Sequence, residues 1–446
     1  MSGVRSQDSG GARTGTRANV WTAEGPVAAD NRLATDRELK GLILRHYLGA
    51  YRAKRFPNRQ PVAWVTSGAP VEILLALGVY PVYPENYGAL VGSHKAAVPY
   101  CERAEEAGFS QDLCAYARTN IGSMLAGKGE LAGRPLPRPD LLVAAKNICD
   151  VVVKWWEVTA RYFDCPLFIL DTPFATDGLN PEQVTYVKNQ LEELVRFTAR
   201  AARRPVPARK SFERKLLDVL ELTRQATELW QEIQALRAHS PTPASALDMF
   251  TNLFPIVTLR GTRTCVDYYR RVRDELAERV ERGVAAVPGE RFRLLWDNIA
   301  VWYDFDMVRY MHARGAAFVG ETYTDAWGVY RFDPADAADP LGAMARQYSL
   351  VLLNVGLATR KERLLNMARA QRADGVVFHS CRSCKTYSLG QYELARAVRD
   401  ELGLPTLIIE ADMVDSRAFA ASPAKTRIDA FLELLAASTS PKSPIS

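Results

Sequence analysis

Seven cysteines are the residues of this chain with the most distinctive chemistry. They are Cys101, Cys114, Cys149, Cys165, Cys265, Cys381 and Cys384. The N-terminal stretch MSGVRSQDSGGARTGTRANVW lacks the apolar core of a secretion signal, so we do not expect a disulfide framework. In a reducing compartment, cysteines serve as small buried apolar residues, as reactive thiols or as metal ligands.

Three of these cysteines stand at comparable places in the predicted structure. Cys149 ends an apolar run, Cys384 follows the run GVVFHS, and Cys114 opens the helical pattern of SQDLCAYARTNIG. A helix N-terminus stabilises a thiolate, and soft thiolates suit iron–sulfur clusters. Three ligands from separate parts of the chain would leave one iron free for a substrate oxygen. Spacing alone is weak support, because the compact cysteine run of a ferredoxin is missing.

The pair Cys381 and Cys384 supports a different interpretation. A single C-x-x-C between a strand and a helix also fits a dithiol redox motif. It could equally be half of a zinc site, although neither a second C-x-x-C nor a histidine pair completes one. On local spacing alone, the dithiol ranks above the cluster.

The elements that must position these residues come from an alternation of short apolar runs and helical patterns. In the first half, strands are expected at 61–67, 79–84, 140–149 and 165–173, with helices between them. Strands that alternate with helices indicate βαβ units and a mostly parallel, doubly wound sheet. The end of such strands is also where ligands gather in open α/β sheets.

A helical middle and a second alternating block follow. Asn180 before Pro181 marks a helix start, and the chain then has helical periodicity to about residue 238. Further strands are expected at 291–302, 315–322, 375–380 and 405–412. We predict an α/β protein with two doubly wound, Rossmann- or flavodoxin-like domains, mainly parallel sheets and a helical middle. The expected boundaries are a disordered tail at 1–35, an N-terminal domain with a helical extension at 36–245, and a C-terminal domain at 246–446.

Bulk composition excludes several classes of function. Hydrophobic residues make up 48% of the chain, charged residues 24%, and the net charge is +6, as in a soluble globular protein. No run approaches the roughly 18–20 apolar residues of a membrane span. The chain also has no zinc-finger spacing and no aromatic–basic RNA motif. We therefore expect a cytoplasmic protein without nucleic-acid or membrane partners.

Several long stretches resemble the family of 2-hydroxyacyl-CoA dehydratases and ATP-dependent benzoyl-CoA reductases, in the subunits that carry the substrate-site cluster. They keep the order they have in that family, over roughly residues 40–435. The stretches are WVTSGAPVEILLALGVYPVYPENYGAL (64–90), GFSQDLCAYARTNIG (108–122), KNICDVVVKWWE (146–157), PLFILDTPF (166–174), RSCKTYSLGQ (382–391) and IEADMVDSR (409–417). The resemblance is strongest to the cluster-bearing second subunit of benzoyl-CoA reductase. It lies in the length of the chain and in the stretches RSCKTYSLGQ and WDNIAVWY.

The resemblance implies a ligand set for an iron–sulfur cluster, expected to be [4Fe–4S]. Carried over by position, the ligands are Cys114, Cys149 and Cys384. Two other cysteines remain alternatives. Cys381 could be a ligand or lie beside the cluster, and Cys101 could be a ligand in place of Cys114. Cys165 and Cys265 are assigned to the core from their apolar or helical surroundings.

The resemblance also implies a polar role beside the substrate for Ser67, which ends the predicted strand 61–67, and for Glu85, which follows the predicted strand 79–84. The competing interpretation is that Ser67 caps a helix and Glu85 lies in a surface turn. His379, near Cys384, is a candidate proton donor, although a structural histidine is the simpler interpretation.

Other polar residues are weaker candidates. His94, Tyr87 and Tyr387 are considered on similar grounds. The basic run 196–215 could meet CoA phosphates or could be a solvated helix face.

The expected function is that of the iron–sulfur subunit of a benzoyl-CoA reductase, which passes single low-potential electrons to an aromatic acyl-CoA to give a cyclic dienoyl-CoA. The alternatives are a subunit of a 2-hydroxyacyl-CoA dehydratase, which eliminates water through a ketyl radical, a non-catalytic electron relay, and a plain dithiol oxidoreductase. The implied partners are an acyl-CoA, a homologous cluster-bearing subunit, an ATP-hydrolysing activator and a ferredoxin donor. The chain has no G-x-x-x-x-G-K-[ST] loop, in keeping with a separate activator.

Overall fold

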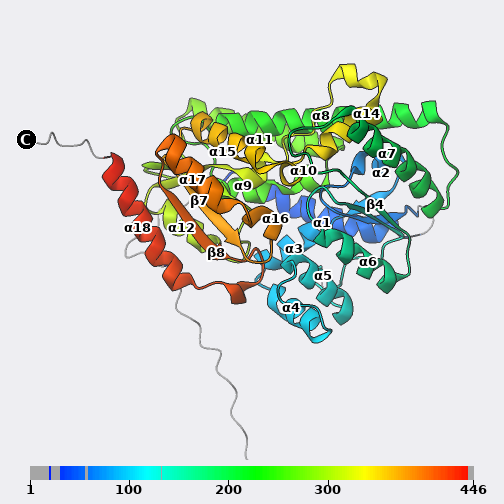
Figure 1. Ribbon diagram of the computed structural model, residues 1–446, viewed down its shortest axis with the longest axis horizontal. Coiled ribbons are helices and arrows are strands. Elements are labelled where there is room, and N and C mark those ends of the chain that lie inside the picture. Colours follow the sequence, from blue (N-terminus) through cyan, green and yellow to red (C-terminus); the bar gives the residue numbers. More distant parts are fainter. Residues whose placement is uncertain (1–19, 22–30, 56–58, 132, 440–446) are drawn as a thin grey trace, which may run out of the picture.

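The computed structural model describes residues 20–21, 31–55, 59–131 and 133–439 (Figure 1). Most of the predicted tail, residues 1–19 and 22–30, lies outside the described residues. Two described residues of that segment are buried against the folded body. Trp21 has its ring centroid 5.5 Å from that of Tyr310 and 6.4 Å from that of Phe419, and Leu33 is 2% exposed.

The first α/β block is built on a sheet of four parallel strands. The strands are β1 (Val62–Val65), β2 (Tyr80–Val82), β3 (Leu141–Ala145) and β4 (Leu167–Leu170). Its helices are α1 (Asp36–Ala53), α2 (Val71–Ala76), α3 (Pro84–Ser93), α4 (Ala97–Glu106), α5 (Ala115–Ala126) and α6 (Val151–Phe163). Every residue of β1 and β3 is buried, because helices cover both faces of a doubly wound sheet.

A helical middle joins the two blocks, as predicted. It consists of α7 (Pro181–Ala201), α8 (Arg209–Leu236), α9 (Ala246–Asn252), α10 (Phe254–Thr258) and α11 (Arg263–Glu281). Asn180 caps α7 by accepting a hydrogen bond from the Gln183 N–H, and Pro181 takes the first helical position. The long helix α8 runs along one edge of the molecule, where it packs against α2 of the first block and against α11 (Figure 1).

The second block repeats the design of the first. Its parallel strands are β5 (Phe292–Asp297), β6 (Ala316–Glu321), β7 (Gly375–Cys381) and β8 (Thr406–Ala411). Its helices are α12 (Phe305–His312), α13 (Thr322–Asp325), α14 (Pro340–Ser349), α15 (Leu357–Ala370), α16 (Lys385–Ser388), α17 (Gln391–Leu402) and α18 (Ala421–Thr439), with 3-10 turns at Pro334–Ala338, Leu352–Asn354 and Ser416–Ala418.

The two sheets share one strand order. It is β2-β1-β3-β4 in the first block and β6-β5-β7-β8 in the second. In both sheets, the second strand in sequence lies on one side of the first strand, and the third and fourth lie on the other side. The strand order therefore reverses between the two central strands, and the crevice at such a switch point is the usual ligand site of the fold. The predicted α/β class with two doubly wound units is confirmed, and the boundaries 36–245 and 246–446 remain our proposal for the domains.

One continuous apolar core joins the blocks. It includes Val65 of the first sheet and Trp296 of the second, both almost fully buried. Among the described residues, no helix combines the length and apolarity that crossing a membrane requires.

Candidate functional site

A single cavity of about 260 Å³ collects five of the predicted site residues. Its lining includes Cys114, Cys149, Cys384, Ser67 and Glu85. Four of these come from the first block and Cys384 comes from the second. The cavity therefore lies where the two switch-point crevices face each other.

Each of the three cysteines stands at or near the start of a helix. Cys114 is the N-cap of α5 and Cys384 is the N-cap of α16, whereas Cys149 lies two residues before α6. The Val151 N–H donates a hydrogen bond to the Cys149 Sγ at 3.3 Å. Free N–H groups at a helix start stabilise a thiolate, so this local placement suits metal ligation.

Burial works against ionisation of the free thiols. It raises the pKa of the Cys114 thiol well above its usual range and that of Cys384 to about 12. The Cys149 and Cys384 charges raise the pKa of Cys114 further, whereas the backbone N–H groups of Tyr116 and Ala117 act in the opposite direction. Thiols that share one buried space in this way need a shared cation to become thiolates.

The donor set fits an iron–sulfur cluster. In a four-iron cluster each thiolate binds a different iron atom, so the sulfurs need not converge on one point. Within the described ranges, His, Cys, Asp and Glu side chains form no group of three or more at single-ion geometry. Three soft thiols around one cavity match the chemistry of a cluster, which they would hold through Cys114, Cys149 and Cys384.

The remaining cysteines do not line the cavity. Cys381 ends β7 with 1% of its surface exposed, and Cys101 is fully buried with its Sγ 3.5 Å from the Thr119 Oγ1. Cys265 is also fully buried, and Cys165 is half-buried. All seven cysteines are free thiols, so no disulfide joins Cys381 to Cys384.

Glu85 and Ser67 form a pair in the cavity wall. Glu85 is the second residue of α3, which begins two residues after the end of β2, and Ser67 lies in the turn after β1. The backbone N–H of Ser67 donates a hydrogen bond to the Glu85 Oε2 at 2.5 Å. Burial raises the pKa of Glu85 to about 7, although the hydrogen bonds from Ser67 oppose the shift. A carboxyl with this pKa can both donate and accept a proton near neutral pH.

The raised pKa of Glu85 predicts a pH-dependent stability. Between pH 5 and pH 8 the folded chain keeps a proton that the unfolded chain releases, so the free energy of unfolding falls as pH rises. Glu85→Gln removes this effect, and its stability relative to the wild type should increase by about 2.5 kcal/mol from pH 5 to pH 8. Urea unfolding at both pH values measures the change. Parallel curves for the two proteins would contradict it, and the exposed Glu401→Gln serves as the control.

His379 lies away from the cavity lining. It is fully buried within β7, and its Nδ1 lies 2.6 Å from the carbonyl oxygen of Ile299. Burial lowers the pKa of His379, so the ring is neutral. This position matches the structural interpretation of His379 that the sequence left open.

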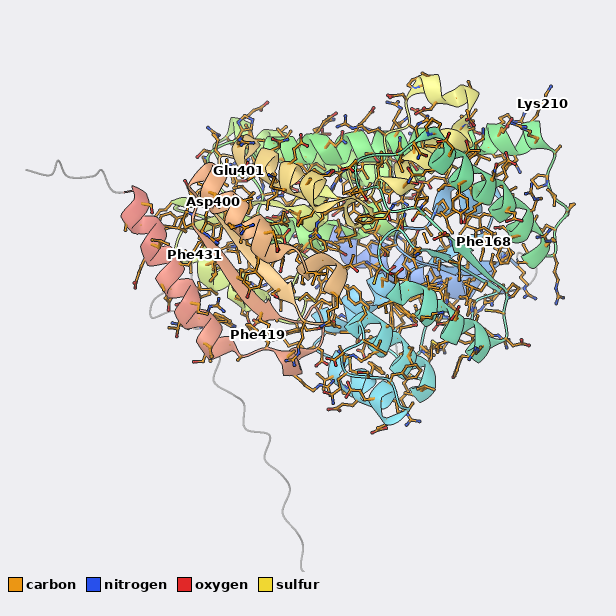
Figure 2. The ribbon with its side chains drawn as sticks, viewed as in Figure 1. Phe168, Lys210, Asp400, Glu401, Phe419 and Phe431 are labelled. Carbon is orange, nitrogen blue, oxygen red and sulfur yellow. The ribbon has the colours of Figure 1, made fainter. Side chains whose placement is uncertain are left out.

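Of the three remaining polar candidates, His94, Tyr87 and Tyr387, only Tyr387 lines the cavity. His94 and Tyr87 do not line the cavity, and the Tyr87 hydroxyl accepts a hydrogen bond from the Glu130 N–H. Tyr387 does line it, with its hydroxyl 2.7 Å from the Thr322 Oγ1. Of the basic run, Lys210 is exposed and stands at the upper right edge of the molecule, whereas α16 lies near the centre of the same view (Figures 1 and 2).

Tyr323 is a site residue that the sequence did not single out. It lies in α13, two residues after β6, and lines the cavity from the second block. Burial raises the pKa of Tyr323, and the charges of Glu85 and Cys384 raise it further, so its hydroxyl stays protonated. In the second sheet β6 occupies the place that β2 has in the first, so Tyr323 follows β6 much as Glu85 follows β2. This correspondence becomes visible only once the strand order is known.

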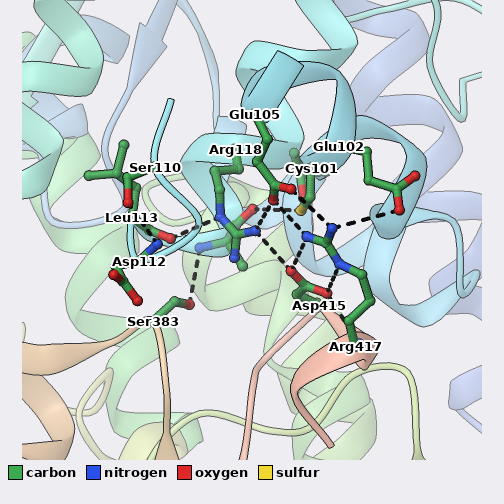
Figure 3. A network of polar contacts seen from close by, with 12 residues as sticks. Cys101, Glu102, Glu105, Ser110, Asp112, Leu113, Arg118, Ser383, Asp415 and Arg417 are labelled. Atoms are coloured by element: carbon green, nitrogen blue, oxygen red, sulfur yellow. Dashed lines mark hydrogen bonds and ion pairs between the residues drawn. The ribbon is translucent and has the colours of Figure 1, made fainter. Parts of the chain in front are cut away.

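A network of charged residues holds the Cys114 segment against the second block (Figure 3). Arg118, with 3% of its side chain exposed, lies 2.7 Å from the Glu105 Oε1 and 2.8 Å from the Asp415 Oδ2. Arg417 contacts the same two carboxylates from the other side. Since Arg118 is four residues from Cys114, these ion pairs fix the start of α5 in space.

A second contact joins the segments of two cysteines directly. The backbone N–H of Ala115 donates a hydrogen bond to the Ser383 Oγ at 3.1 Å, which links the neighbours of Cys114 and Cys384 (Figure 3). The Ser383 N–H in turn donates to the Asp412 Oδ2 at 3.2 Å. These hydrogen bonds therefore hold the segments of the two thiols in place relative to each other.

Breaking the buried network should destabilise the protein. Asp415→Asn leaves the buried Arg118 with only one of its two carboxylate partners, and we expect a loss of about 3 kcal/mol in the free energy of unfolding. Urea unfolding measures it. Glu401→Gln, which removes an exposed pair with Lys361, is the matched control and should cost less than about 1 kcal/mol. Equal losses in the two variants would contradict the role of the network.

Comparison with known proteins gives consistent matches over most of the chain. The family model described as 2-hydroxyglutaryl-CoA dehydratase, D-component, matches residues 66–435. The (R)-2-hydroxyisocaproyl-CoA dehydratase alpha subunit of Clostridioides difficile is 32% identical over 89% of this chain and 95% of that subunit. The (R)-phenyllactyl-CoA dehydratase alpha subunit of Clostridium sporogenes is 29% identical over 90% and 98%. A benzoyl-CoA reductase subunit of Thauera aromatica is 28% identical over 82% and 86%.

Proposed function

The chain belongs to the family described as 2-hydroxyglutaryl-CoA dehydratase, D-component, and we propose that it is the substrate-activating subunit of a 2-hydroxyacyl-CoA dehydratase. The reaction would remove the 2-hydroxyl group and a hydrogen of the neighbouring carbon as water. The product would be the corresponding unsaturated acyl-CoA.

One observation carries this proposal: the three candidate ligand cysteines and the Glu85–Ser67 pair line one cavity. A bound [4Fe–4S] cluster would supply single electrons to the acyl thioester. The remaining chemistry is proton transfer and positioning, for which the cavity offers side chains from both blocks.

Glu85 is suited to move a proton at the leaving hydroxyl group. Its pKa of about 7 means that a large fraction carries a proton at neutral pH, and that proton can pass to the 2-hydroxyl as it leaves. The Ser67 N–H holds the Glu85 Oε2 in place, which fixes the direction of the carboxyl group. The Tyr323 hydroxyl, from a residue of the second block that lines the same cavity, would donate a hydrogen bond to the thioester oxygen.

Benzoyl-CoA reductase, the function first expected from the sequence, is the second candidate. A subunit of that enzyme is among the relatives, at 28% identity. The dehydratase alpha subunits match with similar or higher identity and cover more of both chains, so the comparisons favour the dehydratase alternative. A pure electron relay fits less well, because a relay needs no carboxyl group with a pKa near 7 in a cavity beside its cluster.

The partners belong to the same proposal. The curated relatives are described as subunits of larger enzymes, which supports a second subunit for this chain. We propose that this partner is homologous and carries its own cluster. An ATP-hydrolysing activator, reduced by a ferredoxin, would deliver the electron, and the complex would be cytoplasmic.

The test is an anaerobic assay of the chain purified with its co-expressed partners, ATP and a strong reductant. Offered 2-hydroxyacyl-CoA esters and benzoyl-CoA in parallel, the complex should form unsaturated acyl-CoA from the former. Formation of a cyclic dienoyl-CoA from benzoyl-CoA, with no water elimination, would support the reductase instead.

A further inference from the structure

The cavity wall is nearly free of groups that could neutralise a carboxylate. Among the described residues that line it, no lysine, arginine or histidine occurs. Its ionisable groups are the Glu85 carboxyl, the three thiols and tyrosine hydroxyls, all of which are neutral or negative. A free carboxylate on the acyl chain of the substrate would therefore meet no counter-charge in this wall.

Two buried arginines contact residues of the cavity wall, but both are already engaged elsewhere. Arg360 donates hydrogen bonds to the carbonyl oxygens of Thr386 and Tyr387, at 3.2 and 2.8 Å. Arg260, fully buried, pairs with the Glu72 carboxylate at 3.0 Å. Neither arginine lines the cavity, and turning one toward a ligand would leave buried acceptors unpaired.

One part of the wall is a cluster of aromatic rings. Phe250 of α9 has its centroid 6.1 Å from that of Trp302 and 6.4 Å from that of Phe305, and Trp302 and Phe305 are 6.0 Å apart. All three line the cavity. The Trp302 Nε1–H already donates to the Tyr116 hydroxyl at 2.6 Å, so this wall presents ring surface rather than a polar donor.

We infer that the acyl group bound in this cavity is apolar, a branched aliphatic or aromatic side chain, and carries no free carboxylate. The inference rests on the proposed function, which places an acyl-CoA in the cavity. Ring faces gain contact with apolar carbon, whereas a buried and unpaired carboxylate is strongly disfavoured. The cavity thus selects against acidic acyl groups such as 2-hydroxyglutaryl.

Substrate competition tests the inference in the active complex. The kcat/KM for (R)-2-hydroxy-4-methylpentanoyl-CoA should exceed that for (R)-2-hydroxyglutaryl-CoA by about a hundredfold or more, because the acidic group is left without a partner. Phe250→Arg places a cation in the wall and should reduce this ratio by at least about tenfold. Phe168→Leu, in β4 and outside the cavity lining, should leave the ratio unchanged. A ratio near one in the wild type would overturn the inference.

A binding measurement separates this inference from the proposed reaction. Equilibrium dissociation constants of the complex for 4-methylpentanoyl-CoA and glutaryl-CoA need no chemistry, since both lack the 2-hydroxyl group. We expect the apolar ester to bind at least about tenfold more tightly. Equal or tighter binding of glutaryl-CoA would overturn the inference even if water elimination is observed. Selective binding without any water elimination would instead contradict the proposed reaction and leave the acyl preference standing.

Discussion

Replacing Cys114, Cys149 or Cys384 by serine is expected to remove the bound iron and abolish turnover. Each of these thiols lines the one cavity, and each lies at or near a helix start that favours its thiolate form. A hydroxyl group is a much harder and less acidic ligand, so the cluster loses one of its attachment points. Iron and acid-labile sulfide per chain, measured in anaerobic preparations of the complex, report the loss.

The other cysteines supply matched controls for this experiment. Cys101→Ser and Cys165→Ser change thiols outside the cavity lining and should retain the iron. Cys381→Ser tests the second of the two alternative ligands, as Cys101→Ser tests the first, because Cys381 precedes Cys384 by three residues yet is buried in β7. Full iron in a Cys114, Cys149 or Cys384 variant, or its loss in Cys381→Ser alone, would contradict the ligand set.

Glu85→Gln should lower kcat by about 10²–10⁴-fold, the usual contribution of a general acid or base. Glutamine keeps the volume and can accept the Ser67 hydrogen bond, but it cannot transfer a proton. Because Glu85 has a pKa of about 7 and acts in its protonated form, the wild-type kcat should fall above pH 7, and this limb should be missing in the variant. A pH profile of kcat for both proteins measures the difference.

Two outcomes of the Glu85 experiment are informative. The iron content should be unchanged, because Glu85 is not among the proposed ligands, and Glu401→Gln on the exposed surface of α17 should have wild-type activity. Wild-type kcat in Glu85→Gln would leave the carboxyl with a structural role only, and the electron-relay alternative would then become the better account.

Local sequence patterns were sufficient to predict most of the fold. The apolar runs at 61–67 and 140–149 contain the fully buried parallel strands β1 and β3, and Asn180–Pro181 became the capped start of α7. The positions of Cys114 and Cys384 at helix starts were also predictable, because a strand end followed by helical periodicity has a visible signature. The choice of Cys384 over Cys381 was not, since it depended on the family resemblance.

Contacts between distant segments escaped prediction from the sequence. The pair Arg118 and Asp415 is separated by 297 residues, and no periodicity indicates which two charges of a chain will meet. Tyr323 follows an ordinary strand, and it lines the same cavity as Glu85 only because residues of both blocks meet there. His379 illustrates the reverse case: it is close to Cys384 in sequence, but the strand buries its ring outside the cavity lining.

The most direct test of the proposed dehydratase function counts the electrons and ATP molecules consumed for each product molecule. In the anaerobic complex supplied with a 2-hydroxyacyl-CoA, the elimination of water is redox-neutral, so one electron can serve repeatedly. We predict that product accumulates far beyond the reductant consumed, and that ATP is needed only in catalytic amounts. Consumption of two electrons for every product, with ATP hydrolysed at each turnover, would contradict the dehydratase function and identify a reductase.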